Sequence, residues 1–142
     1  NIKSGDKSME KATELLYQTC LGYNILKRTT LITPSGQIAD YVDKKYPDMQ
    51  RTATNSEVTA YYTSFIFGLD LSDDLPKYSS LLLPYHAFIV NFGKKTIIDY
   101  AHKYGISVMY NNINKINDIE YLSNIGADTI ITAKPYSAYQ II

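Results

Sequence analysis

The chain has 142 residues, of which 45% are hydrophobic, so it can bury one compact core but is short for two domains. Fourteen basic residues balance fourteen acidic ones, which excludes a global field that would favour nucleic acid or an anionic membrane. The single cysteine, Cys20, excludes an internal disulfide and a cysteine-based zinc site and leaves the cellular compartment open.

The first half of the chain predicts helices that alternate with short strands. Apolar residues at helical spacing fill the first segment, and Gly22 follows it as a helix stop. Pro34 and Ser35 open a second helix, which Pro47 ends. In chain order we expect a helix over 8–21, a strand over 30–33, a helix between Pro34 and Pro47, and a strand over 49–54.

Residues 55–69 predict the clearest helix of the chain. Asn55 or Ser56 is expected to cap it. Apolar residues then recur three or four positions apart, which is the spacing of one helix face. We expect this face to pack on the core, with docking to a membrane or a partner as the alternative. The face comprises Val58, Tyr61, Tyr62, Phe65, Ile66 and Leu69.

The second half continues the alternation, and its strands are expected to be parallel. No Asn-Gly or Asp-Gly dipeptide joins two expected strands, so no antiparallel hairpin is predicted. Strands that recur about every 20 to 30 residues are typical of right-handed βαβ units. After a polar loop we expect a strand over 80–84, a helix over 94–104, a strand over 106–110, a helix over 117–125 capped by Asn117, and a strand over 129–132.

Residues 100–135 carry the most specific pattern. A helix ends in Ala-His-Lys-Tyr-Gly, a strand leads to Asn-Asn-Ile-Asn, and a second helix precedes Ile-Gly-Ala-Asp-Thr-Ile-Ile-Thr-Ala-Lys-Pro. This order resembles the end of glycerophosphodiester phosphodiesterases. The resemblance implies an α/β fold, the C-terminal portion of a TIM (β/α)8 barrel in which parallel strands alternate with helices. The matching residues are Ala101, His102, Gly105, Asn114, Gly126, Asp128, Ile130, Ile131, Thr132 and Pro135.

Residues 1–142 are therefore expected to form one partial barrel domain whose N-terminal half is absent. A complete barrel of this kind needs about 250 residues. The chain also begins at Asn1 without a methionine or a signal pattern, as a piece of a longer protein would.

Ligands of such barrels bind at the carboxyl ends of the strands, which points to polar residues just after each expected strand. Neutral amides there can donate to phosphate oxygens and hold glycerol hydroxyls. The asparagines after 106–110 could instead form only a turn and a helix cap, and His86 could be a packed histidine bonded to the backbone. The candidate substrate-binding residues are Asn111, Asn112, Asn114, Ser35, Asn55 and His86, with Thr33, Thr54, Tyr85 and Thr132 beside them.

The resemblance implies hydrolysis with a divalent metal, Ca²⁺ or Mg²⁺, held by carboxylates while two histidines act as acid and base. The family motifs for these groups, His-Arg, Glu-x-Asp and His-Asp, do not occur here, so we expect neither a catalytic residue nor a metal ligand in this chain. Asn111 stands where the family usually has tryptophan, and Ala133 where it has aspartate. His102 is expected to be structural, and the acidic loop around Asp70, Asp73 and Asp74 to be solvated rather than to bind a cation.

Two hypotheses of different classes follow. The first is the C-terminal portion of a phosphodiesterase that cleaves a glycerol phosphodiester or phospholipid head group, inactive as this chain alone. The second is a non-catalytic half-barrel that binds a ligand, pairs with itself or docks on a missing half, because an open half-barrel leaves strand edges and apolar surface uncovered. A phosphate-binding barrel of the sugar-metabolism kind is less favoured, because the glycine-rich loops expected after the last two strands are missing.

Overall fold

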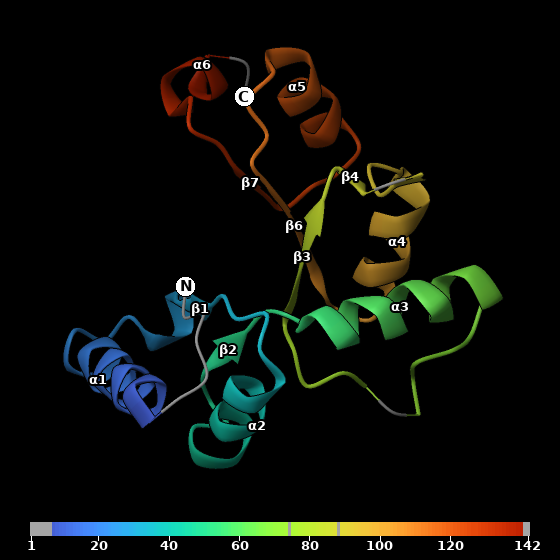
Figure 1. Ribbon diagram of the computed structural model, residues 1–142. Coiled ribbons are helices and arrows are strands. Elements are labelled where there is room, and N and C mark those ends of the chain that lie inside the picture. Colours follow the sequence, from blue (N-terminus) through green and yellow to red (C-terminus); the bar gives the residue numbers. More distant parts are fainter. Residues whose placement is uncertain (1–6, 74, 88, 141–142) are drawn as a thin grey trace.

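A parallel β-sheet forms the centre of the computed structural model, which describes residues 7–73, 75–87 and 89–140 (Figure 1). β1 pairs with β2, a single bridge between Thr52 and Ser80 links β2 to β3, and β3 pairs with β6, which pairs with β7. Neighbours in space therefore follow chain order, as in a barrel wall. The strands are β1 (Thr30–Leu31), β2 (Gln50–Arg51), β3 (Ser80–Pro84), β6 (Ser107–Asn111) and β7 (Thr129–Ile131).

Helices connect these strands and cover one face of the sheet. Alternate residues of β3 and β6 point at the helices and are fully buried, namely Leu81, Leu83, Val108 and Tyr110. The residues between them, Leu82 and Met109, are only partly buried, so the opposite face is less covered. The helices are α1 (Lys7–Gly22), α2 (Gly36–Lys45), α3 (Asn55–Phe67), α4 (Lys95–Lys103), α5 (Ile116–Asn124) and α6 (Pro135–Tyr139), with a 3₁₀ turn at Leu26–Arg28.

The buried side chains form two clusters, one for each half of the chain. The smaller cluster lies between α1, α2 and β1 and includes Ile38, Val42 and Leu31. The larger one lies between α3, α4, α5 and the strands β3 and β6, with Ile97 and Leu122 at full burial. Burying such aliphatic side chains stabilises the fold by roughly 1.5–3 kcal/mol each. The second half, which carries the resemblance, therefore has the larger share of the core.

An antiparallel hairpin breaks the expected all-parallel pattern. β4 (His86–Ala87) pairs with β5 (Val90–Asn91) in the connection between β3 and α4. The strands expected from the sequence pair in parallel, as predicted, and this hairpin is an additional element that was not predicted. Two hydroxyl groups from elsewhere in the chain bond to the segment just after the hairpin: Tyr110 donates to the carbonyl of Phe92 at 2.8 Å, and Tyr121 donates to that of Gly93 at 3.1 Å.

Two helix caps also differ from expectation. Thr54, rather than Asn55 or Ser56, caps α3, because its hydroxyl accepts from the amide of Glu57 while the Glu57 carboxylate accepts from the amide of Thr54. This reciprocal capping box satisfies two amides at once. Lys115 stands at the N-cap of α5, where Asn117 was expected, and it makes no side-chain cap bond.

The apolar face predicted for α3 is only partly buried. Tyr61 is buried, and Val58, Tyr62 and Phe65 pack against the larger cluster. Ile66 and Leu69 are 58% and 50% exposed, so the prediction was wrong for the last part of the face. The helix ends at Phe67, with Gly68 in the left-handed conformation, so Leu69 lies beyond it. Among the described residues, no helix is long and apolar enough to cross a membrane.

Candidate functional site

The carboxyl ends of β3 and β6 carry five of the polar side chains singled out from the sequence. Tyr85 and His86 follow β3, and Asn111, Asn112 and Asn114 end or follow β6. Together they line a hollow of about 550 Å³. Lys115 and Asp118, which the sequence argument did not propose, line it as well.

Asn114 stabilises the loops that line this hollow. Its side-chain oxygen accepts from the hydroxyl of Thr132 at 3.2 Å and from the amide of Ala133 at 2.8 Å. Its amide nitrogen donates to the side chain of Asn112 at 3.0 Å. The residue thus ties the loop after β6 to the loop after β7. Asn112 turns the chain through a left-handed conformation, φ 62°, which asparagine tolerates better than most residues.

Asn111 is the amide best placed to meet a ligand. Its exposed side chain makes no hydrogen bond with any residue that the structure describes. It also lines a second hollow of about 410 Å³, together with Thr33 from the loop after β1 and Asn55, the first residue of α3. Ser35 lines neither hollow and begins α2, with its amide donating to the hydroxyl of Thr33. Of the other five candidate residues, four share a hollow with Asn111, namely Asn112, Asn114, His86 and Asn55.

The hairpin places His86 and Tyr85 at the rim. Their rings lie 4.1 Å apart between centroids, and the amide of Phe92 donates to the carbonyl of Tyr85 at 3.0 Å. Gly93 is buried beneath the Tyr85 ring, and a Cβ at that position would overlap it. Burial, then the nearby charge of Asp118, raises the pKa of the Tyr85 hydroxyl. The hydroxyl is therefore a neutral donor at physiological pH.

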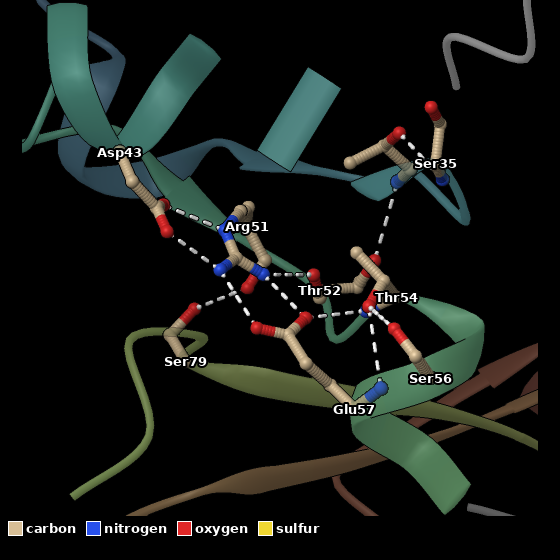
Figure 2. Close-up of polar contacts among 9 residues, drawn as sticks. Ser35, Asp43, Arg51, Thr52, Thr54, Ser56, Glu57 and Ser79 are labelled. Carbon is tan, nitrogen blue, oxygen red and sulfur yellow. Dashed lines mark hydrogen bonds and ion pairs between the residues drawn. The ribbon is translucent and has the colours of Figure 1, made fainter. Parts of the chain in front are cut away.

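A buried arginine on β2 was missed from the sequence. The Arg51 side chain is 2% exposed and lies between Asp43 of α2 and Glu57 of α3 (Figure 2). Its guanidinium donates twice to each carboxylate at 2.7–2.9 Å and once to the carbonyl of Thr52 at 3.1 Å. Arginine has five N–H donors, so none remains for a ligand.

The electrostatics of this cluster favour the charged forms. Burial alone would raise the pKa of Glu57, but hydrogen bonds from Arg51 and from the amide of Thr54 outweigh it and lower the pKa. Burial opposes the charge on Arg51, but both carboxylates raise its pKa. Arg51 is therefore a structural link between β2, α2 and α3 and not a phosphate ligand.

The residues described here do not fit a metal site. Within 7–73, 75–87 and 89–140, no three His, Cys, Asp or Glu side chains come close enough together to hold an ion. In the acidic loop, hydrogen bonds from Ser72 and then from Lys103 lower the pKa of Asp70. Asp74 lies outside the described residues.

Solved structures show the same architecture, whereas no protein-family model matches the chain and no curated protein is significantly similar to it. Three of these structures are a protein assigned as a glycerophosphoryl diester phosphodiesterase from Silicibacter pomeroyi DSS-3 (TM-score 0.67), a glycerophosphodiester phosphodiesterase from Parabacteroides distasonis ATCC 8503 (0.60) and a protein assigned as one from Galdieria sulphuraria (0.64). Each is 14% identical. In the same order, the matches include 96%, 98% and 96% of the residues of this chain. They include 45%, 54% and 51% of the residues of the solved structures.

The chain has the fold of the C-terminal part of a glycerophosphodiester phosphodiesterase barrel. It spans about half the length of the solved structures that it matches. The fold predicted from the motifs at residues 100–135 is thereby confirmed.

The motif residues that resemble glycerophosphodiester phosphodiesterases contact one another. His102 on α4 lies 2.8 Å from the carboxylate of Asp128, which also accepts from the amide of Val108 at 2.7 Å. This pair joins α4 to the beginnings of β6 and β7, the end of the barrel remote from the hollows. At the other end, Asn114 bonds to Thr132. The expected structural role of His102 agrees with this position.

Proposed function

We propose that this chain is the C-terminal half of a glycerophosphodiester phosphodiesterase-like barrel, and that the whole protein hydrolyses glycerol-linked phosphodiesters. The observation that supports the proposal most is the fold, five parallel strands in barrel order, whose carboxyl ends gather Asn111, Asn112 and His86 around one hollow. Ligands of (β/α)8 barrels bind at this end.

In this proposal the chain supplies substrate contacts. The free amide of Asn111 can donate to a phosphate oxygen or to a glycerol hydroxyl, and its oxygen can accept from such a hydroxyl. His86 and Tyr85 form one wall beside it. A head group attached to the phosphate would lie against these rings.

The divalent metal expected for the whole protein, Ca²⁺ or Mg²⁺, finds no ligand set among the described residues. We therefore assign this chain no metal-dependent step and no catalytic residue. As it stands, the chain should bind a glycerol phosphodiester weakly and should not turn it over.

The test compares two proteins with glycerophosphocholine and Ca²⁺ or Mg²⁺. The chain of 142 residues should show no hydrolysis, and the complete gene product should release glycerol phosphate. In the complete product, Asn111→Ala should raise KM several-fold, whereas Asn124→Ala, at the far end of α5, should not change it. Turnover by the chain alone, or no hydrolysis by the complete product, would refute the proposal.

The alternative is a non-catalytic half-barrel that binds a ligand or dimerises. The observation in its favour is the less covered face of the sheet, with Leu82 and Met109 partly buried and Thr129 exposed. Sedimentation equilibrium of the chain separates the two: a stable, closed dimer favours the module, whereas a monomer that associates without a defined size favours the enzyme half.

A further inference from the structure

A second polar hollow lies between the start of α5 and the short helix α6, beside the one at the strand ends. Its volume is about 620 Å³, large enough for a phosphate with a small organic group. Figure 1 shows α5 and α6 next to each other at the C-terminal end of the chain. The hollow is lined by Asn114, Lys115, Ile116, Asn117, Asp118, Ile119, Lys134 and Ser137. We propose that this hollow binds a phosphate monoester.

The donors that line the hollow lie at the surface: Lys115, Asn117 and Lys134 are exposed, and Ser137 is half-buried. Across the part of the chain that the structure describes, the side chains of Lys115, Asn117, Lys134 and Ser137 make no hydrogen bond and no ion pair with another residue. Lysine ammonium groups are donors only, and the hydroxyl and the amide can also donate. A phosphate group, which presents several acceptor oxygens, complements this set.

The charge of the hollow favours a monoester over a diester. Lys115 and Lys134 supply two positive charges, and Asp118 supplies one negative charge. Near neutral pH a phosphate monoester carries a charge of about −1.5 to −2, whereas a diester carries one negative charge. The Coulomb attraction to the two lysines is therefore greater for the monoester.

The position of the hollow also suits phosphate. In many (β/α)8 barrels the loops after the last two strands hold a phosphate group, commonly through backbone amides of glycine-rich loops. Here the corresponding loops, which follow β6 and β7, contain no glycine over 112–115 and 132–135. Side-chain donors take the place of those amides. The inference does not rest on the hydrolytic function, because it requires only that this chain bind phosphate.

The test is a titration of the chain with inorganic phosphate at constant ionic strength, followed by amide chemical shifts. Shifts should saturate at the starts of α5 and α6. Lys115→Gln and Lys134→Gln should each weaken binding about tenfold, which corresponds to the loss of one charge-assisted hydrogen bond. Asp118→Asn should tighten binding several-fold, because it removes the only negative charge that lines the hollow.

Two controls separate this site from general attraction to positive charge. Lys11→Gln removes an exposed lysine on α1, far along the chain, and should leave binding unchanged. Binding of a monoester such as glycerol 3-phosphate should also weaken when the pH falls below about 6, because the ester then loses its second charge. An absence of saturable shifts up to tens of millimolar phosphate, or an equal loss in Lys11→Gln, would overturn the proposal.

A third arm identifies the source of the phosphate group. Glycerol 3-phosphate and vesicles of phosphatidylcholine with phosphatidic acid present the same monoester in soluble and in lipid form. Binding to the soluble ester alone assigns a small metabolite, and binding to the vesicles that Lys134→Gln weakens about tenfold assigns a lipid head group. Binding to neither form contradicts the proposal.

Discussion

Replacing Arg51 by methionine tests the idea that a buried ionic link holds the first half of the chain to the second. The substitution keeps most of the side-chain length and removes the charge and all five hydrogen bonds. Breaking a buried pair by removing one partner costs roughly 3–5 kcal/mol, because the other charge is left without compensation. Here Asp43 and Glu57 are 17% and 31% exposed, so water recovers part of that cost.

We therefore expect Arg51→Met to lower the free energy of unfolding by about 2–3 kcal/mol at neutral pH. Urea denaturation followed by circular dichroism measures this, with the slope m unchanged if only stability has changed. The matched control is Arg28→Met, the only other arginine, which is exposed and should change stability by less than about 0.5 kcal/mol.

The same variant predicts a pH dependence. The pKa of Glu57 is lowered in the folded state below its reference of 4.5, so its contribution to stability is complete above that value and is lost as the pH falls through the folded pKa. Arg51→Met removes the interaction, so the difference between variant and parent should shrink as the pH falls below about 4.5. A variant as stable as the parent at pH 7, or a difference that grows in acid, would refute the reasoning.

Three further changes probe the site and the core. Gly93→Ala should destabilise the fold by about 1–3 kcal/mol in urea and shift the ring resonances of Tyr85, because the new methyl group overlaps that ring. Asn114→Ala should cost about 1–3 kcal/mol through its lost bonds, whereas Asn111→Ala should cost under about 0.5; equal costs would contradict their assigned roles. Burial, then the charge of Glu57, raises the pKa of Tyr78 to about 12, so stability should fall between about pH 10 and 12, and by less in Tyr78→Phe when urea midpoints are compared.

The alternation of helices and strands could be predicted because it depends on local apolar spacing. The lengths of the strands could not be predicted, because a strand extends only as far as an adjacent strand pairs with it. Residues 30–33 gave a strand of two residues, because β1 pairs with β2 only at Thr30 and Leu31. The hairpin was missed because no Asn-Gly or Asp-Gly turn marks it, and the residues that bond to the segment just after it, Tyr110 and Tyr121, are distant in sequence.

The proximity of most candidate residues could be predicted, because the carboxyl ends of parallel strands lie at one edge of the sheet; their role as a binding site stays a prediction. The sequence could not predict which of these polar side chains remain without a hydrogen bond, because that depends on the residues that other loops bring close to them. Asn114 is used by Thr132 and Ala133, and Asn111 is not. No sequence pattern around Arg51 predicts that it is buried and paired. The spacing of Thr54 and Glu57 is typical of a capping box and could have predicted that the Glu57 carboxylate lies at the start of α3, near Arg51.

The contacts among the matching residues explain why the resemblance bears on the fold, whereas activity stays a proposal. His102 and Asp128 join α4 to the starts of β6 and β7, and in barrels that end governs stability rather than chemistry. Asn114 and Thr132 fasten two loops at the opposite end. At the proposed ligand contact, Asn111 departs from the family pattern. A sequence can therefore keep such a pattern to hold its barrel together while its binding hollow diverges, so specificity must be measured at Asn111 and His86 rather than inferred from the motif.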